Sequence, residues 1–181
     1  IEEAPGDCWS LEALSVLHFE RIKAGADTPE NRRNMLAFAA RAEECSASLW
    51  NPHLMRAWLA AADFSREAPA LYPQESANRV AAHQELAQLQ GAPESVAAPA
   101  RAIESFLLSV EAREAFGRKD HLVAIPPLMR AAELDPTNLE AASRATICCW
   151  WLKEFAAGIA VAERAIALLD EAGAVAPERL P

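Results

Sequence analysis

Residues 119–170 read KDHLVAIPPLMRAAELDPTNLEAASRATICCWWLKEFAAGIAVAERAIALLD, and this stretch decides the fold because it repeats itself. Lys119 and Lys153, thirty-four positions apart, occupy equivalent places in the repeat. The same shift aligns further pairs: Ala124 with Gly158, Ile125 with Ile159, Arg130 with Arg164, Ala131 with Ala165 and Leu134 with Leu168. A fixed period of this length is typical of helical hairpins that stack side by side. The sequence therefore predicts an all-α protein.

The repeat has small residues at Ala124, Ala131, Gly158 and Ala165, an aromatic residue at Phe155, and the ending Leu134-Asp135-Pro136. With these features, residues 105–170 resemble the tetratricopeptide repeat (TPR) family. The resemblance implies antiparallel helix hairpins stacked as a right-handed solenoid, with seven to eight helices in the chain. It also implies an adaptor or scaffold that binds a protein or peptide in a concave groove.

In proteins of the TPR family, the first helix of each repeat lines this groove. Carried over to the matching positions, the resemblance implies that one helix contributes Phe106, Ser109, Arg113 and Phe116. The next repeat would contribute Glu140, Ser143, Arg144, Ile147, Trp150 and Trp151. Aromatic residues and arginines carry much of the binding energy at protein interfaces. The alternative for the two tryptophans is that they pack beneath a neighbouring helix.

The composition limits the partners that we expect. The chain has 17 Lys and Arg against 26 Asp and Glu, a net charge of −9, whereas nucleic-acid-binding surfaces are normally positive. A membrane-spanning helix needs about 20 consecutive apolar residues, and the sequence has no such run. We therefore expect no nucleic acid as a partner and no membrane span.

The sequence begins at Ile1 and shows no charged and apolar leader, so either a leader was removed or the chain is part of a longer protein. A cytoplasmic location is favoured over an exported or periplasmic one, since free thiols would suit a reducing compartment. Arginine outnumbers lysine, and alanine and proline are abundant, a composition associated with GC-rich bacterial genes.

Helix signals and prolines divide the chain into four parts. We expect divergent helical hairpins over residues 1–92, a linker over 93–100, the TPR-like repeats over 101–170 and a tail over 171–181.

In the first helix, residues 10–23, the apolar side is predicted to hold Leu11, Leu14, Leu17 and Ile22. In the sixth, Pro126-Pro127 predicts a kink or a late start, because proline cannot donate an intrahelical hydrogen bond. The eighth has a regular apolar stripe at Phe155, Ile159, Ala162, Ile166 and Leu169.

Groups that could carry catalysis or bind a cofactor are scarce. The four histidines lie in no metal-binding motif, and the chain has no glycine-rich phosphate loop. We therefore expect no enzymatic activity in this segment, no metal and no cofactor. Cys148 and Cys149 are expected to be buried as small apolar residues.

Cys8 and Cys45 are equidistant from the predicted turn at residues 25–28, so an antiparallel hairpin would bring them to one level. They form either a disulfide, with Cα atoms about 4.4–6.8 Å apart, or a pair of free thiols, as a reducing cytosol would keep them.

Two other functions remain open at this stage. The chain could be a regulatory or substrate-recruiting domain of a larger bacterial enzyme such as a glycosyltransferase, or a helical signalling domain of a transcriptional regulator. Because no long helix is predicted after the eighth, we also expect its outer face to be covered by more chain or by self-association, since repeat arrays need polar terminal caps.

Overall fold

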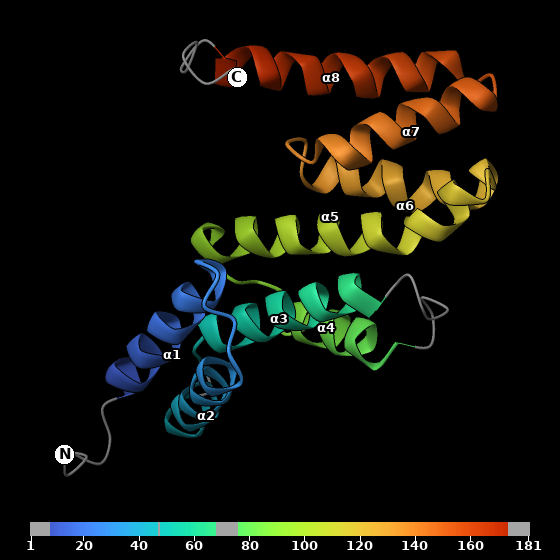
Figure 1. Ribbon diagram of the computed structural model, residues 1–181. Coiled ribbons are helices and arrows are strands. Elements are labelled where there is room, and N and C mark those ends of the chain that lie inside the picture. The colour runs from blue at the N-terminus through green and yellow to red at the C-terminus, as the bar shows by residue number, and fades with distance from the viewer. Residues whose placement is uncertain (1–7, 47, 68–75, 174–181) are drawn as a thin grey trace. The chain divides into compact units, whose positions relative to one another are not determined.

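The computed structural model describes residues 8–46, 48–67 and 76–173, and within these ranges it contains eight helices and no strand. This confirms the prediction of an all-α protein (Figure 1). The helices are α1 (Cys8–Lys23), α2 (Pro29–Cys45), α3 (Asn51–Glu67), α4 (Ala77–Ala87), α5 (Glu94–Gly117), α6 (His121–Leu134), α7 (Leu139–Trp151) and α8 (Phe155–Gly173). In the described residues, no helix is both long and apolar enough to cross a bilayer. The predicted tail begins within α8, and its residues 174–181 lie outside the described ranges.

Side-chain caps fix where several helices begin. Thr28 accepts a hydrogen bond from the amide of Asn31 and is followed by Pro29 in the first turn of α2. Asp120 and Asn138 cap α6 and α7 by accepting from the amides three residues ahead. Each cap satisfies a backbone N–H that has no partner within its own helix. The local sequence therefore determines where these helices begin.

The chain forms two compact units. Unit 1 comprises Ile1–Ala60 and Val80–Ala100, and unit 2 comprises Ala61–Arg79 and Arg101–Pro181. The sequence assigned residues 61–79 to the first domain, whereas in the structure they group with the repeat region. The predicted linker over 93–100 is also wrong for residues 94–100, because α5 begins at Glu94 and contains Pro99. The amides of Val96 and Ala97 bond to the carbonyl of Pro93, so the proline-rich segment starts a helix instead of separating two.

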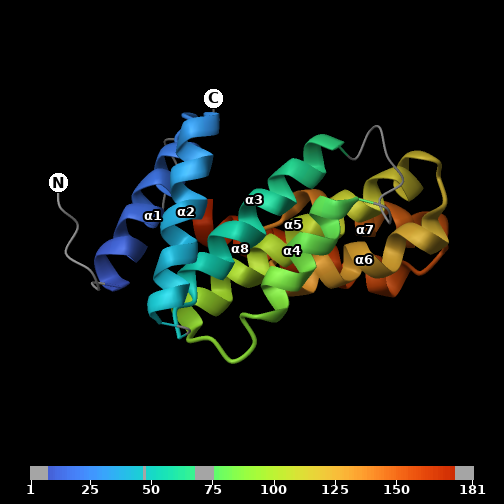
Figure 2. The same ribbon diagram turned by 90° about the horizontal axis from the view of Figure 1, so that it is seen from below.

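Unit 1 is built on the antiparallel pair α1 and α2, which lie side by side in Figures 1 and 2. Its core contains Phe19, Ile22, Met35, Met55 and Leu59, and the ring of Trp58 meets that of Phe19 edge to face at 5.3 Å. The predicted apolar side of α1 is wrong at two positions, because Leu14 and Leu17 are 40% and 48% exposed. Instead the buried side of α1 is Glu12, Ser15, Phe19 and Ile22.

Polar partners explain this unexpected choice of face. The Ser15 hydroxyl donates to the carbonyl of Met35 at 2.9 Å, and the amide of Asn51 donates to the Glu12 carboxylate at 2.8 Å. A buried polar group with a partner costs little, whereas an apolar residue can remain exposed. Hydrophobic periodicity alone therefore selected the wrong side of α1.

Cys8 and Cys45 are bonded as a disulfide, with Cα atoms 5.5 Å apart. The bond joins the start of α1 to the end of α2, at the level that equal distance from the turn requires. Cys45 is exposed, whereas Met35 and Ala42 of the same helix are buried.

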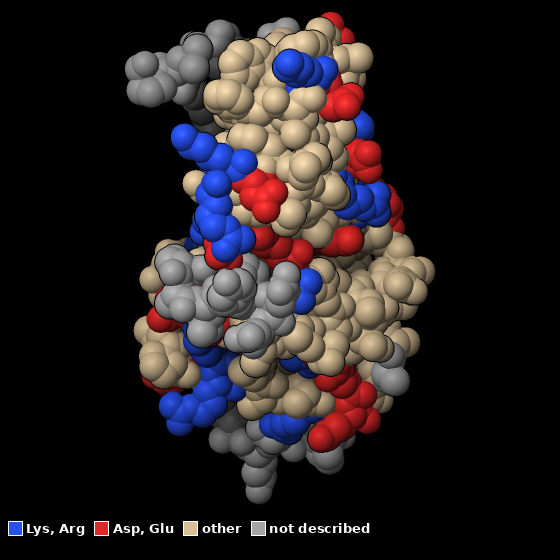
Figure 3. Space-filling view, turned by 90° about the vertical axis from the view of Figure 1, so that its right-hand side faces the viewer, with Lys and Arg blue, Asp and Glu red and all other residues tan. Residues whose placement is uncertain are grey.

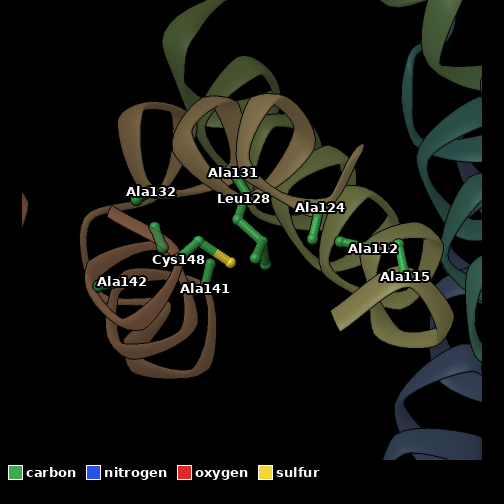
Figure 4. Close-up of a cluster of buried hydrophobic side chains, with 10 residues drawn as sticks. Ala112, Ala115, Ala124, Leu128, Ala131, Ala132, Ala141, Ala142 and Cys148 are labelled. Atoms are coloured by element: carbon green, nitrogen blue, oxygen red, sulfur yellow. The ribbon is translucent and has the colours of Figure 1, made fainter. Parts of the chain in front are cut away.

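Unit 2 has a core of small side chains in which Leu128 and Cys148 are fully buried (Figure 4). Alanines from α5, α6 and α7 surround Leu128, and they are Ala112, Ala115, Ala124, Ala131, Ala132, Ala141, Ala142 and Ala145. Small residues allow neighbouring helices to approach closely, which is why α6 packs on α7 and α7 on α8 over their lengths.

The two hairpins of unit 2 close through turns with the same backbone hydrogen bonds. In the first turn, the amides of Arg118, Lys119 and Asp120 donate to the carbonyls of Glu114, Phe116 and Ala115. In the second, the amides of Leu152, Lys153 and Glu154 donate to the carbonyls of Cys148, Trp150 and Cys149. Lys119 and Lys153 both have φ of 63°, a conformation uncommon for residues other than glycine. The thirty-four-residue repeat in the sequence is thus also a repeat of backbone geometry.

Helix α6 begins at His121, directly after its cap, so the predicted late start is wrong. Pro126 and Pro127 lie inside the helix. They remove the hydrogen bonds to the carbonyls four residues earlier, at Leu122 and Val123. These two residues are 72% and 58% exposed, so water can reach that turn.

Candidate functional site

Helix α7 presents a mixed polar and aromatic stripe to solvent. Glu140, Arg144, Ile147 and Trp151 follow one another at intervals of four, three and four residues, which places them on one side of the helix. Ile147 and Trp151 are 43% and 57% exposed, and Trp150 is 59% exposed. The two tryptophans therefore do not pack beneath a neighbouring helix.

Helix α5 contributes the second part of this surface. Phe106 and Arg113 lie two turns apart and are both partly exposed. Nη2 of Arg113 lies 3.9 Å from Oε1 of Glu140 on α7, and the guanidinium of Arg144 lies over the ring of Phe116, 5.4 Å from its centroid. We call this the α5–α7 surface, defined by Phe106, Arg113, Phe116, Glu140, Ser143, Arg144, Ile147, Trp150 and Trp151.

Charged and cation–π contacts link four of these nine predicted residues across α5 and α7: Arg113, Phe116, Glu140 and Arg144. Phe106, Ser143 and Ile147 are exposed on the same two helices, and the Ser143 hydroxyl donates to the carbonyl of Glu140 at 3.1 Å. Figure 3 views the side of the molecule where the α5–α6 and α7–α8 turns lie, and its upper part, over α7 and α8, is largely uncharged.

Glu140 holds the charged part of the α5–α7 surface in place. Its Oε1 lies 2.6 Å from Nη1 of Arg144, a buried nitrogen that makes an ion pair without the angle of a directed hydrogen bond. Arg144 is thus fixed between a carboxylate and an aromatic ring, where a guanidinium is attracted by both. Because two arginines share one carboxylate, the site carries local positive charge on an acidic protein. An anionic or aromatic group of a ligand would be attracted to it.

Ser109, which the resemblance also placed in the groove, is buried and does not belong to this surface. The side-chain amide of Asn138 donates to the hydroxyls of Ser105 and Ser109, at 2.9 and 3.1 Å. The Ser105 hydroxyl donates in turn to the carbonyl of Ala131 at 2.7 Å. These bonds join α5, α6 and the start of α7, so they hold the α5–α7 surface rigid from behind.

His121 is a member of this region that the sequence reasoning missed. Its ring stacks on Trp151 with an interplanar angle of 3°, and it meets Phe116 edge to face at 6.3 Å. Trp151 meets Trp150 at 4.8 Å, so four rings form a continuous chain from the end of α5 to the end of α7. The sequence repeat could have indicated this role for His121, because the shift by thirty-four residues aligns His121 with the aromatic Phe155.

Cys148 and Cys149 are both fully buried, as expected. Adjacent residues can both be buried because α7 packs against α6 on one side and α8 on another. Burial raises the pKa of both thiols above the ordinary value, and neighbouring negative charge adds to it. Although Cys148 Sγ lies 3.5 Å from Nδ1 of His121, its thiol is thus disfavoured as a nucleophile.

A cleft of about 270 Å³ lies between α6, α7 and α8, away from the α5–α7 surface. None of the nine predicted residues lines it; its walls are Met129, Ala132, Glu133, Pro136, Ala142, Ala157, Ala160, Val161, Arg164 and Ala165. The cleft exists because most of these side chains are small. Its lining is mostly apolar, with Glu133 and Arg164 as the charged members.

Unit 1 contains a charged cluster that the sequence did not indicate. Arg56 donates to both carboxylates of Glu43 and Glu85, and His53 lies between them, 3.2 Å from Glu43 and 2.8 Å from Glu85. The hydrogen bonds from Arg56 lower the pKa of Glu43. Burial opposes the charge of Arg56, but the two carboxylates outweigh it and raise its pKa.

This cluster joins α2, α3 and α4, and its guanidinium is paired with two carboxylates, which is typical of a structural ion-pair network. In the described part of the chain, no three His, Cys, Asp or Glu residues are grouped so that they could hold a metal ion.

Comparison of the chain with protein-family models, with curated proteins and with solved structures gave no match.

Proposed function

We propose that this chain is a protein-interaction module of TPR-like form, which binds a peptide or protein segment on the α5–α7 surface. One observation carries the proposal: four large apolar side chains are exposed on α5 and α7, and an arginine of α7 lies over an aromatic ring of α5. These side chains are Phe106, Ile147, Trp150 and Trp151, and the arginine is Arg144. Exposed apolar residues grouped in this way are typical of interaction sites, whereas single ones are not.

The chemistry of the surface indicates the kind of segment it fits. Trp150 and Trp151 offer flat apolar area, while Arg113 and Arg144 share only one carboxylate. Arg113 is held loosely, at 3.9 Å, and can reorient toward a ligand. We therefore expect a segment in which an apolar or aromatic residue lies close to an Asp, a Glu or a C-terminal carboxylate. Such a ligand would gain aromatic contact and a charge-assisted hydrogen bond together.

A random peptide display library tests this proposal, because such a library samples ligands of every composition. The expected result is enrichment of peptides with an aromatic residue near an acidic one. Trp151→Ala and Arg144→Ala should each weaken binding of the enriched peptides at least about fivefold, equivalent to about 1 kcal/mol. Because Trp151 is more than half exposed, its substitution should leave the melting temperature nearly unchanged.

Leu17→Ala is the matched control, because Leu17 is another exposed apolar residue, on α1 in the other unit. It should bind the same peptides as the wild type. Enriched peptides that bind Trp151→Ala and Arg144→Ala as tightly as the wild type would contradict the proposed site. A large fall in stability from Trp151→Ala would show that the ring serves the fold instead.

A further inference from the structure

The outer side of α8 carries an exposed apolar stripe. Phe155, Ile159 and Ile166 are 52%, 56% and 56% exposed. Their intervals of four and seven residues place them on one side of the helix, and Ala162 lies between them on that side. An adjoining side of α8, about 100° away around the helix, packs on α7 through Gly158, Val161 and Ala165. The regular stripe seen in the sequence is thus real, but within the described residues it is not part of the core.

The repeat shows what kind of structure fits this stripe. A shift by thirty-four residues aligns Phe155, Ile159, Ala162 and Ile166 with His121, Ile125, Leu128 and Ala132 of α6. Those four residues of α6 are buried or half-buried: His121 contacts Cys148 of α7, and the other three lie in or against the core that α5, α6 and α7 share. The outer face of α8 therefore continues, one repeat further, the interface between α6 and α7. What fits it is another helix.

From these observations we infer that two copies of this chain associate through α8, with the two helices antiparallel. The inner part of the stripe is nearly symmetric about Ala162, since Ile159 precedes it by three residues and Ile166 follows it by four. An antiparallel pair with its twofold axis at Ala162 brings Ile159 of each copy against Ile166 of the other. The small Ala162 lies at the crossing point, where two helices approach most closely. A surface that matches itself in this way is what a twofold interface requires.

The size of the stripe sets the strength of the association. Three half-exposed large side chains cannot supply the roughly 800 Å² per partner of a standard interface. The dimer is therefore weak and forms at high protein concentration. It uses a surface distinct from the α5–α7 surface, so the two proposals stand or fall separately.

Like charges make association of two copies depend on salt in a way that the binding of an uncharged partner helix would not. Glu163 is exposed and lies beside the stripe, one residue from the twofold axis. The two Glu163 carboxylates of an antiparallel pair therefore fall on the same side of the interface and repel each other. Each chain also carries a net charge of −9. Salt screens both repulsions, so association should strengthen as the salt concentration rises.

Sedimentation equilibrium over a wide range of protein concentration tests the inference. The wild type should show a monomer–dimer equilibrium that shifts toward dimer in high salt. Ile159→Glu should weaken association at least tenfold, and Glu163→Gln should strengthen it severalfold at low salt. Leu17→Glu, an equivalent change at an exposed apolar residue of α1, should leave it unchanged. Circular dichroism should show all variants folded, because every substituted side chain is exposed.

The orientation has its own test, which uses a cysteine at the proposed axis. Oxidation of Ala162→Cys should produce a disulfide-linked dimer, whereas Ala167→Cys, exposed away from the axis, should not. A wild type that is monomeric at every concentration would overturn the inference. A dimer unaffected by Ile159→Glu, or one that Ala162→Cys does not trap, would also overturn it.

Discussion

Units 1 and 2 are both made of helices, yet different interactions hold them together. Unit 1 is joined by a disulfide and by a charged cluster that links Arg56 to Glu43 and Glu85. In unit 2 the core of α5, α6 and α7 packs small side chains around Leu128, and its ion pairs, such as Arg113 with Glu140, lie at the surface. Helices that meet through alanine, glycine and cysteine approach closely and repeat their geometry, whereas helices joined by long polar side chains need no repeat. The difference explains why only unit 2 shows a period in its sequence.

The largest expected effect comes from the core of unit 2. Leu128→Ala should lower the free energy of unfolding by about 2–5 kcal/mol, because Leu128 is fully buried and its small neighbours cannot fill the cavity. Denaturant unfolding followed by circular dichroism measures the change. Leu14→Ala, at an exposed leucine of α1, is the control and should cost no more than about 0.5 kcal/mol. Equal losses in the two variants would contradict the core assignment.

The disulfide should stabilise unit 1 nearly as much. Cys8 and Cys45 close a loop over a separation of 37 residues, for which chain entropy predicts about 4 kcal/mol, with measured values usually about 2–4 kcal/mol. Cys45→Ser should therefore speed hydrogen exchange in α1 and α2 while leaving α6 and α7 protected. Faster exchange in α6 and α7 as well would show that the two units do not differ in this way.

The state of the thiols checks the bond directly. Denatured, unreduced protein should titrate with two free thiols, those of Cys148 and Cys149, and reduced protein with four. The folded protein should react slowly with thiol reagents, because burial raises the pKa of both free thiols. Four thiols without reduction would rule out the disulfide.

A smaller effect is expected where α8 approaches α7. A methyl group added at Gly158 would lie 2.9 Å from Cβ of Cys149, too close without a shift of the helices. Overpacking costs about 1–3 kcal/mol, against roughly 1 kcal/mol gained when alanine replaces glycine in a helix. Gly158→Ala should therefore be net destabilising in thermal unfolding.

Two further variants sharpen this comparison. Gly117→Ala should not destabilise, because nothing lies within 4 Å of its added methyl group. The cost of Gly158→Ala should shrink in a Cys149→Ala background, which reproduces the pair Ala115 and Ala124 of the first hairpin. Stabilisation by Gly158→Ala alone would show that close approach does not govern this position.

The smallest effect concerns acid. Hydrogen bonds from Arg56 lower the pKa of Glu43 below its ordinary value of 4.5, so the unfolded chain binds a proton there more readily than the folded one. This contribution to stability is present above pH 4.5 and is lost as the pH falls through the lower pKa of the folded state. Glu43→Gln should reduce stability at pH 7 and flatten its decline between about pH 5 and 3. Wild-type and variant curves of equal slope would contradict the assignment.

The sequence by itself determined the elements of this protein. Caps such as Thr28, Asp120 and Asn138 and the proline at the start of α2 act within one turn of a helix, so they can be read locally. The thirty-four-residue repeat aligns the two equivalent turns, because Lys119 and Lys153 and their neighbours occupy matching positions in it. Equal spacing from a turn also allowed the pairing of Cys8 with Cys45, although it left the bond itself open.

Only the tertiary structure decided which face of each helix is buried and which residues meet. Ser15 and Glu12 displaced Leu14 from the inner side of α1 because their partners, Met35 and Asn51, lie on other helices. For the same reason, Ser109 is bonded to Asn138 and is not part of the predicted surface, whereas His121 stacks on Trp151 beside that surface. The stripe of α8 looks like a core face in sequence, since periodicity reports that a helix has an apolar side but not what covers it. Burial depends on neighbours far along the chain, and local pattern carries no record of them.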